Sequence, residues 1–340
     1  MLRAGHSDGK LPDMERGVTT SNEPAGRDPT SLPAKLLYRR LIDTFQAGEA
    51  PDFSVGTPMA WVKAIDELLA DGHVEIAQGA LARLRKRDPD LQWTENILEL
   101  IDLTPAQAGK ASRFVDRRED DVQLVRREGS DLVVFAFCGR MHRMGLPTWM
   151  FQRWMGWLNA NVVYLRDFAN LHFLGGVRSW GSRQRTAISL QWIVEQLQAK
   201  RVICVGNSSG GYAAMFYGLE IGAQGVLNFS GGTNLEPVFN TFLNRIDLAK
   251  ELKQAFPDLG LDLRERYLAA AKPRTVVVYG DQAWDDRIQC EHMAGVPDVE
   301  LISLDGFAGH GTMPELIRRG RFAGVLNDLA GTGAAADGPP

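Results

Sequence analysis

One short segment in the middle of the chain restricts its possible folds more than any other: Gly206-Asn207-Ser208-Ser209-Gly210. The apolar run at 201–205 before it is typical of a buried strand, and the run after Gly211 is typical of a helix. A Gly-x-Ser-x-Gly pattern between strand and helix predicts a sharp, strained turn that lifts the serine hydroxyl above the edge of a parallel sheet. We interpret Ser208 as a nucleophile. The alternative is a tight turn whose serine only caps the helix, and it fits Ser209 equally well.

From about residue 120 onward, apolar strands alternate with helical segments. Strand-like runs occupy 122–126, 131–137, 161–165, 201–205, 225–229, 275–279 and 299–304. Helical patterns occupy 148–158, 183–198, 211–219 and 314–329. The alternation predicts an α/β domain at 120–330 with a doubly wound, mostly parallel sheet, since nearly continuous apolar strands suit a sheet covered on both faces. In the longest gap between strands, helix-like stretches at 235–243, 246–256 and 263–271 predict a small helical cap at about 235–271.

The region at 36–110 is predicted to be an all-α appendage. Two amphipathic stretches, at 59–69 and 75–84, flank a turn at Gly72 and resemble one tetratricopeptide-like hairpin. The signature does not repeat, and such arrays need about three units to bury their faces. We therefore expect the helices to pack on the next domain; the alternative is a groove for a protein partner. The polar segment at 1–35 is expected to be a disordered tail, and 331–340 a frayed one.

Composition narrows the function classes. The 340 residues carry a formal net charge of −4 without a basic stripe, so no nucleic-acid partner is expected. No apolar run approaches the roughly 20 residues of a membrane span, and no apolar signal core stands near residue 1. Cys138, Cys204 and Cys290 form no CxxC pair, which argues against a zinc or disulfide framework. We expect a cytoplasmic protein without a metal site.

A serine hydroxyl needs a base that removes its proton. Of six histidines, His310 is placed best, between two glycines in the loop directly after the last expected strand. The carboxyl ends of parallel strands meet at one edge of a sheet, so this loop should lie near Ser208. The alternative is an ordinary surface histidine.

A carboxylate must orient that histidine and stabilise its charged form. The loop after the strand at 275–279 holds three acids, of which Asp281 stands closest to the sheet. We expect Asp286 to be the acid of the triad, with Asp285 as the second candidate. Either one can instead cap the following helix.

Acyl transfer creates a negatively charged oxygen that fixed N–H groups must stabilise. One donor is expected to be the backbone amide of Ser209, at the start of the helix. The other donor is expected to be the backbone amide of Gly139 or of Arg140, in the loop after the strand at 131–137. The sequence does not decide between these two residues. Arg166, just past another strand, is a candidate for binding an anionic substrate group, and a solvated arginine is the alternative.

With these pieces in place, residues 120–329 resemble the α/β-hydrolase superfamily. The resemblance rests on the elbow at 206–211, the acid loop at 280–286 and the segment Gly309-His310-Gly311. It implies a Ser-His-Asp triad that works without a cofactor. Two details differ from the common pattern: Ala283 occupies the usual place of the acid, and the His-Gly-Gly oxyanion motif of lipases is absent.

The sequence thus predicts a serine hydrolase that cleaves a small-molecule ester or thioester through an acyl-enzyme. An acyltransferase would use the same triad, with an alcohol or amine in place of water. The alternative from another class is a non-catalytic interaction protein, in which the helical region recruits a protein partner and the hydrolase-like domain is a scaffold.

Overall fold

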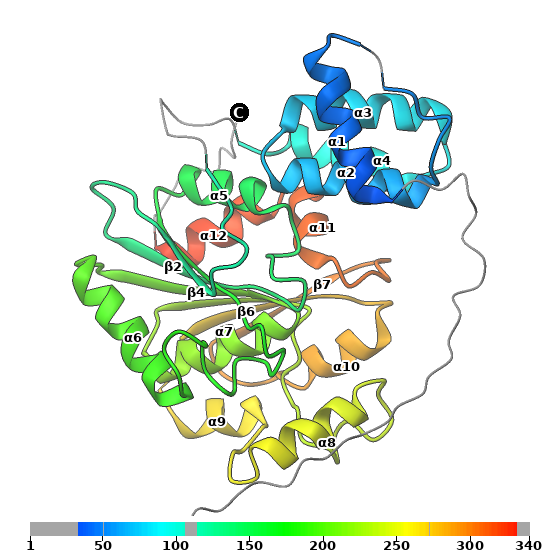
Figure 1. The fold of residues 1–340 in the computed structure, drawn as a ribbon. Helices are drawn as coiled ribbons and strands as arrows, with labels where there is room; N and C mark the ends of the chain where they lie inside the picture. The colour runs from blue at the N-terminus through cyan, green and yellow to red at the C-terminus, as the bar shows by residue number, and fades with distance from the viewer. Residues whose placement is uncertain (1–32, 50, 106–113, 272, 332–340) are drawn as a thin grey trace, which may run out of the picture.

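The computed structural model describes residues 33–49, 51–105, 114–271 and 273–331 (Figure 1). The tails expected at 1–35 and 331–340 lie outside these residues, apart from their inner ends. At the first of those ends, helix α1 already begins at Ala34.

The centre of the molecule is a seven-stranded sheet. Its strands are β1 (Val122–Val125), β2 (Leu132–Phe137), β3 (Asn161–Leu165), β4 (Arg201–Asn207), β5 (Gly225–Phe229), β6 (Arg274–Gly280) and β7 (Val299–Leu304). They lie in the order β1-β3-β2-β4-β5-β6-β7, and only the β1–β3 pair at one edge is antiparallel. The sheet therefore grows outward in both directions from β2 and β4. This confirms the doubly wound, mostly parallel fold predicted from the sequence, and places its switch point between those two strands.

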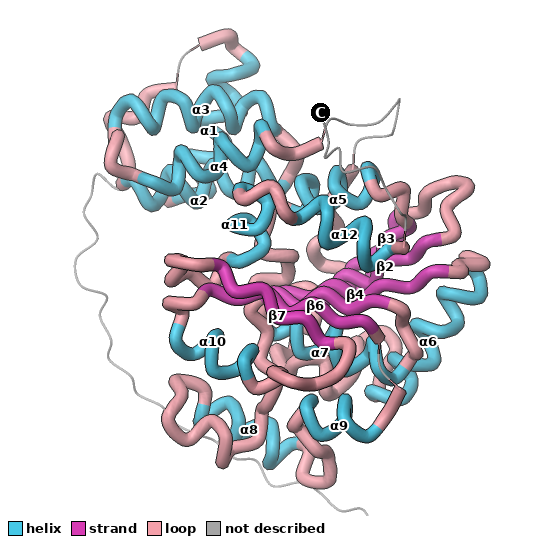
Figure 2. Tube along the Cα trace, turned by 180° about the vertical axis from the view of Figure 1, so that it is seen from behind, coloured by secondary structure: helices cyan, strands magenta, loops and turns pink. Residues whose placement is uncertain are grey.

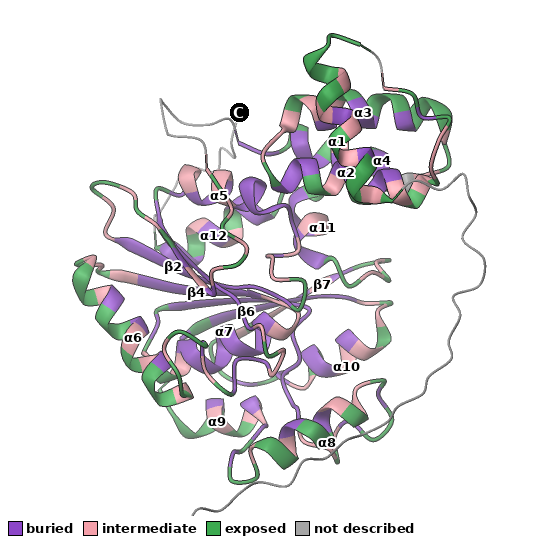
Figure 3. Cartoon of the chain, viewed as in Figure 1, coloured by how far each residue is buried: buried purple, intermediate pink, exposed green. Residues whose placement is uncertain are grey.

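Helices cover both faces of the sheet. One face carries α5 (Thr148–Trp157), α11 (Thr312–Arg318) and α12 (Phe322–Ala330). The other carries α6 (Arg183–Gln196), α7 (Ser209–Glu220), α8 (Ile246–Ala255), α9 (Leu263–Ala269) and α10 (Trp284–Glu291) (Figure 2). Alternate residues of β2 enter the two cores, with Val134 on one side and Phe135 on the other. The central strands are accordingly buried along their length (Figure 3), as their continuous apolar runs predict.

Two expected helices differ from the structure. The run at 314–329 is divided into α11 and α12, because Gly320 adopts a left-handed φ of 65° and ends the first helix with a bond from the Arg321 amide to the Leu316 carbonyl. The stretch at 235–243 forms turns instead of a helix. There the Asn240 side chain donates to the backbone carbonyls of Asn234 and Glu236, each at 2.9 Å. Such local bonds compete with helical ones.

Four further helices, which we call the helical unit, pack against the domain. They are α1 (Ala34–Gln46), α2 (Pro58–Ala70), α3 (Val74–Arg87) and α4 (Gln92–Asp102). The unit lies over α5 and α11 (Figures 1 and 2). Its buried side chains, Trp61 among them, form one continuous core with that face of the sheet. The appendage therefore packs on the domain, as expected. Within the described part of the chain, every helix is too short or too polar to cross a bilayer.

Candidate active site

Ser208 stands in the turn between β4 and α7, at the switch point of the sheet. Its backbone has φ 57° and ψ −122°, a conformation that residues other than glycine rarely adopt. The Ser208 amide donates to the Phe229 carbonyl at 2.8 Å, and its carbonyl accepts from the Gly211 amide at 2.9 Å. Strained backbone held in this way is common at functional sites. The half-buried serine is thus fixed at the carboxyl end of β4.

The glycines of the motif are required by close backbone contacts. A Cβ on Gly210 would lie 2.0 Å from the Phe137 carbonyl oxygen. A Cβ on Gly206 would lie 2.0 Å from the carbonyl oxygen of Gly210. These are the approaches between strand and helix that the Gly-x-Ser-x-Gly spacing predicts.

His310 and Asp286 form a close pair. The imidazole Nδ1 of His310 lies 2.5 Å from Oδ2 of Asp286. The histidine side chain is 48% exposed, whereas that of the aspartate is 5% exposed. A buried carboxylate on Nδ1 fixes the tautomer of the ring and leaves Nε2 for another partner.

The three acids of this loop have separate partners. Asp286 is held on its other oxygen by Arg245, whose Nη2 lies 2.5 Å from Oδ1. Asp285 accepts from the Asn244 side chain at 3.1 Å, so it is not the histidine's partner. Asp281 accepts from the backbone amide of Phe307 at 3.1 Å and thereby holds the loop that carries the histidine.

Backbone and hydroxyl contacts join the serine turn to the histidine loop. Phe229, whose carbonyl accepts from the Ser208 amide, is followed directly by Ser230. The Ser230 hydroxyl lies 2.9 Å from the Thr312 hydroxyl. Thr312 stands two residues after His310. Among the described residues, the Ser208 hydroxyl itself has no hydrogen-bond partner, to His310 or to another group. Such catalytic contacts are often formed only in the complex with substrate.

The loop at 138–143, which we call the oxyanion loop after the donor that the sequence predicts there, lies against Ser208. A Cβ on Gly139 would be 3.4 Å from the Ser208 Cβ and 2.9 Å from the Asn207 carbonyl oxygen. The Gly139 amide is already bonded to the Arg143 carbonyl at 3.0 Å. In the part of the chain that the structure describes, the amides of Arg140 and Ser209 have no acceptor. The two candidates for the second oxyanion donor therefore differ in that the Gly139 amide is already bonded, and the choice between them stays a prediction.

Arg166 does not have the position expected for a substrate-binding residue. Its side chain is fully buried. It pairs with Asp116 at 2.5 Å and donates to the carbonyls of Asp120 at 2.9 Å and His142 at 3.2 Å. A fully buried guanidinium whose three nitrogens all donate inside the protein supports a loop and is out of reach of a substrate, so the structure contradicts this expectation.

His172, which the sequence did not single out for chemistry, is buried beside the helix of the elbow. Its ring meets that of Tyr212 edge to face, with centroids 6.1 Å apart, and its Nδ1 has no hydrogen-bond partner in the described part of the chain. Burial, with smaller contributions from the charges of Arg245 and Arg140, lowers the pKa of His172 to about 4. The ring is therefore neutral at physiological pH. Neither His172 nor Arg245 carries a local pattern that reveals its place.

The three cysteines provide a chemical test of the core. All are buried, and burial raises the pKa of Cys138 to about 12 and raises the pKa of Cys204 and Cys290 as well. Because the thiolate is the reactive form, we expect the native protein to resist iodoacetamide at mildly alkaline pH and to react at all three sites once unfolded. Mass spectrometry counts the adducts. Rapid alkylation of the native protein would contradict the buried placement.

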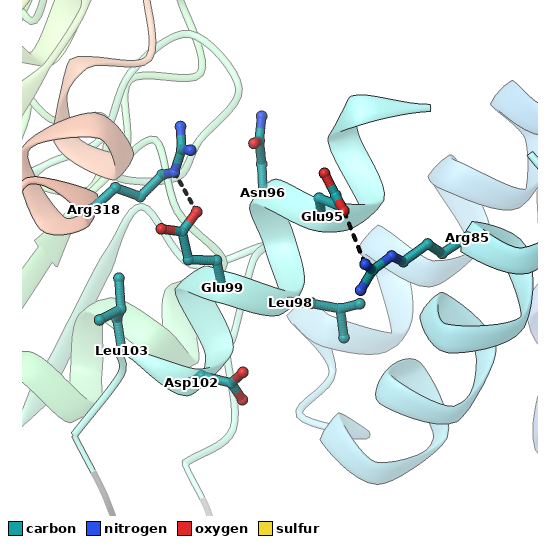
Figure 4. A pocket seen from close by; sticks show the side chains of 8 residues that line it. All are labelled: Arg85, Glu95, Asn96, Leu98, Glu99, Asp102, Leu103 and Arg318. Carbon is teal, nitrogen blue, oxygen red and sulfur yellow. Dashed lines mark hydrogen bonds and ion pairs between the residues drawn. The ribbon is translucent and has the colours of Figure 1, made fainter. Parts of the chain in front are cut away.

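A concave surface lies between the helical unit and α11 (Figure 4). It is lined by Arg85, Glu95, Asn96, Leu98, Glu99, Asp102, Leu103 and Arg318. Its arginines are already paired, Arg85 with Glu95 at 3.0 Å and Arg318 with Glu99 at 2.6 Å. Each pair joins two helices, so both arginines of the groove have a structural role. Among the described side chains, no cluster of three or more histidines, cysteines and acids is arranged to hold a metal ion.

No protein-family model matches the chain, and no curated protein matches it. The tetratricopeptide-like resemblance of the helical unit therefore finds no support. Solved structures show a similar course of the chain at low identity. MenH from S. aureus has 13% identity and a TM-score of 0.41, covering 62% of this chain and 98% of that one. Esterase B from Lactobacillus rhamnosis has 14% identity and a TM-score of 0.43, covering 74% and 96%. An alpha/beta hydrolase from a Mar Chica lagoon metagenome has 18% identity and a TM-score of 0.40, covering 64% and 95%.

Proposed function

We propose that the protein is a serine hydrolase that cleaves an ester or thioester through a Ser208-His310-Asp286 triad. The observation that carries the proposal is the pairing of His310 Nδ1 with buried Asp286 at 2.5 Å, in a loop tied to the strained serine turn. A base held in this tautomer, at the same sheet edge as an unbonded serine hydroxyl, is the arrangement that acyl transfer needs.

In the first half of the reaction, Nε2 of His310 takes the proton of the Ser208 hydroxyl as its oxygen attacks the substrate carbonyl carbon. The carbonyl electrons move to the oxygen, which becomes an oxyanion. The free amides of Ser209 and Arg140 are the donors that we assign to it. The histidine then gives the proton to the leaving group, the bond to that group breaks, and an acyl-serine ester remains.

The second half repeats these steps with water. His310 takes a proton from water, the hydroxide oxygen attacks the acyl carbon, and the proton returns to Ser208 as the acid is released. Asp286 stays ionised throughout and stabilises the imidazolium that forms twice. Arg245 holds the carboxylate from its other side, so we assign it a positioning role.

A covalent probe tests this proposal. A fluorophosphonate reacts with an activated serine, so we expect one adduct per native chain, located on Ser208 by peptide mass spectrometry. The same preparation should hydrolyse short p-nitrophenyl esters and lose this activity as the adduct forms. Protein unfolded before the probe is added should remain unlabelled. Absence of an adduct, or an adduct on another serine, would refute the assignment.

A further inference from the structure

The helical unit contacts the oxyanion loop through one ion pair. Arg143, at the end of the loop, places its Nη1 2.6 Å from Oδ2 of Asp66 on α2. The two side chains are only 33% and 25% exposed. A charge-assisted bond that is partly shielded from water holds its partners more firmly than an exposed surface pair. Asp66 thus holds Arg143 from outside the α/β domain.

Arg143 is bonded in turn to the part of the loop that touches the serine. Its carbonyl accepts the Gly139 amide at 3.0 Å, and the Gly139 carbonyl accepts the His142 amide at 2.8 Å. These two bonds close a tight turn around Arg140, whose amide has no acceptor among the described residues. Because Gly139 also packs against Ser208, a shift of Arg143 would move the Arg140 amide relative to the serine.

A second anchor of the loop also leads to α2. Buried Arg166 donates to the His142 carbonyl and pairs with Asp116. Asp116 lies 3.7 Å from Arg118. Arg118 pairs with Glu67 at 2.6 Å and with Asp71 at 3.4 Å, both at the end of α2 that carries Asp66. Both supports of the loop therefore reach the same acidic end of one helix.

We propose that the helical unit is a positioning element of the active site, and that Asp66 acts through Arg143 to hold the Arg140 amide where the oxyanion forms. The inference rests on the proposed function. Asp66 and Arg143 are positioning residues, since neither touches the reacting atoms. The helices thus serve catalysis by bracing a loop that the α/β domain also holds, through Arg166 and through the bond from the Cys138 amide to the Leu165 carbonyl.

The test replaces one charge in the full chain. Asp66→Asn keeps the size of the side chain and removes the charge that binds Arg143. We expect kcat for a p-nitrophenyl ester to fall by about tenfold to a hundredfold with KM nearly unchanged, because oxyanion contacts form mainly in the transition state. Asp66→Glu, which keeps the charge, should recover part of the loss.

Glu99→Gln is the matched control. It breaks the 2.6 Å pair with Arg318, which also joins the helical unit to the domain but does not involve the oxyanion loop. Its kcat should stay within about threefold of the wild type. An equal fall in kcat in both variants, or a higher KM with unchanged kcat in Asp66→Asn, would overturn the inference. Either result would instead indicate a general role of the helical unit in packing.

Hydrogen–deuterium exchange provides a measurement that needs no turnover. In Asp66→Asn, the peptide covering 138–146 should exchange faster than in wild type, while the core peptide covering β4 stays protected. In Glu99→Gln both should behave as in wild type. Unchanged exchange at 138–146 in Asp66→Asn would overturn the anchoring, whatever the ester assay shows. If the wild type neither hydrolyses esters nor reacts with fluorophosphonate, the proposed function fails, and exchange still decides whether α2 holds the loop.

Discussion

Ser208→Ala is expected to leave only a small residual rate of ester hydrolysis and to abolish fluorophosphonate labelling. Removing the nucleophile of a serine triad costs about six orders of magnitude in kcat, because the remaining residues cannot form the acyl intermediate. The Ser208 hydroxyl has no hydrogen-bond partner among the described residues, and its backbone bonds do not depend on the side chain. The fold should therefore survive the change. Steady-state rates and adduct mass are the measurements.

Ser209→Ala is the informative comparison for this variant. The change retains the Ser209 amide that we assign to the oxyanion, so the protein should still be labelled on Ser208. Thermal unfolding of both variants should match the wild type closely, since neither hydroxyl makes a bond to the described part of the fold. Labelling of Ser208→Ala on residue 209 would mean that Ser209, and not Ser208, is the nucleophile.

The sheet and the serine turn were predictable because their determinants are local. Strand β4 is marked by its own apolar run, and the contacts of Gly206 and Gly210 involve residues whose spacing is written in the motif. Parallel strands then bring their carboxyl ends together, so topology alone placed His310 and Asp286 at the same edge as Ser208. These predictions required the order of elements and no knowledge of side-chain packing.

The remaining features depend on contacts between distant segments. Arg245 lies in the turn between two stretches expected to be helical, 235–243 and 246–256, and nothing local marks it as the partner of Asp286. Arg166 stands just past a strand end, as a substrate ligand would. Its guanidinium is nevertheless bound inside the protein, by the Asp116 side chain and by the carbonyls of Asp120 and His142. Asp66 is one of two acids on an amphipathic helix. A sequence pattern gives the face of a helix, but it does not say which loop meets that face.

Asp286→Asn is expected to lower kcat by about four orders of magnitude. An asparagine of nearly the same size can turn its amide N–H₂ toward Nδ1 of His310 and thereby favour the tautomer that carries its proton on Nε2. That nitrogen then cannot accept the serine proton, and no carboxylate remains to stabilise the imidazolium. Fluorophosphonate labelling should slow in proportion, because it uses the same base.

Asp285→Asn separates this effect from a general disturbance of the acid loop. Asp285 is the neighbouring residue on the same helix and bonds to the Asn244 side chain, so the amide preserves its size and one hydrogen bond. Its kcat should remain within about threefold of the wild type. Circular dichroism and thermal unfolding establish that both variants are folded. A large loss in Asp285→Asn with near-normal rates in Asp286→Asn would reverse the assignment, since the 2.5 Å contact with His310 would then have no part in catalysis.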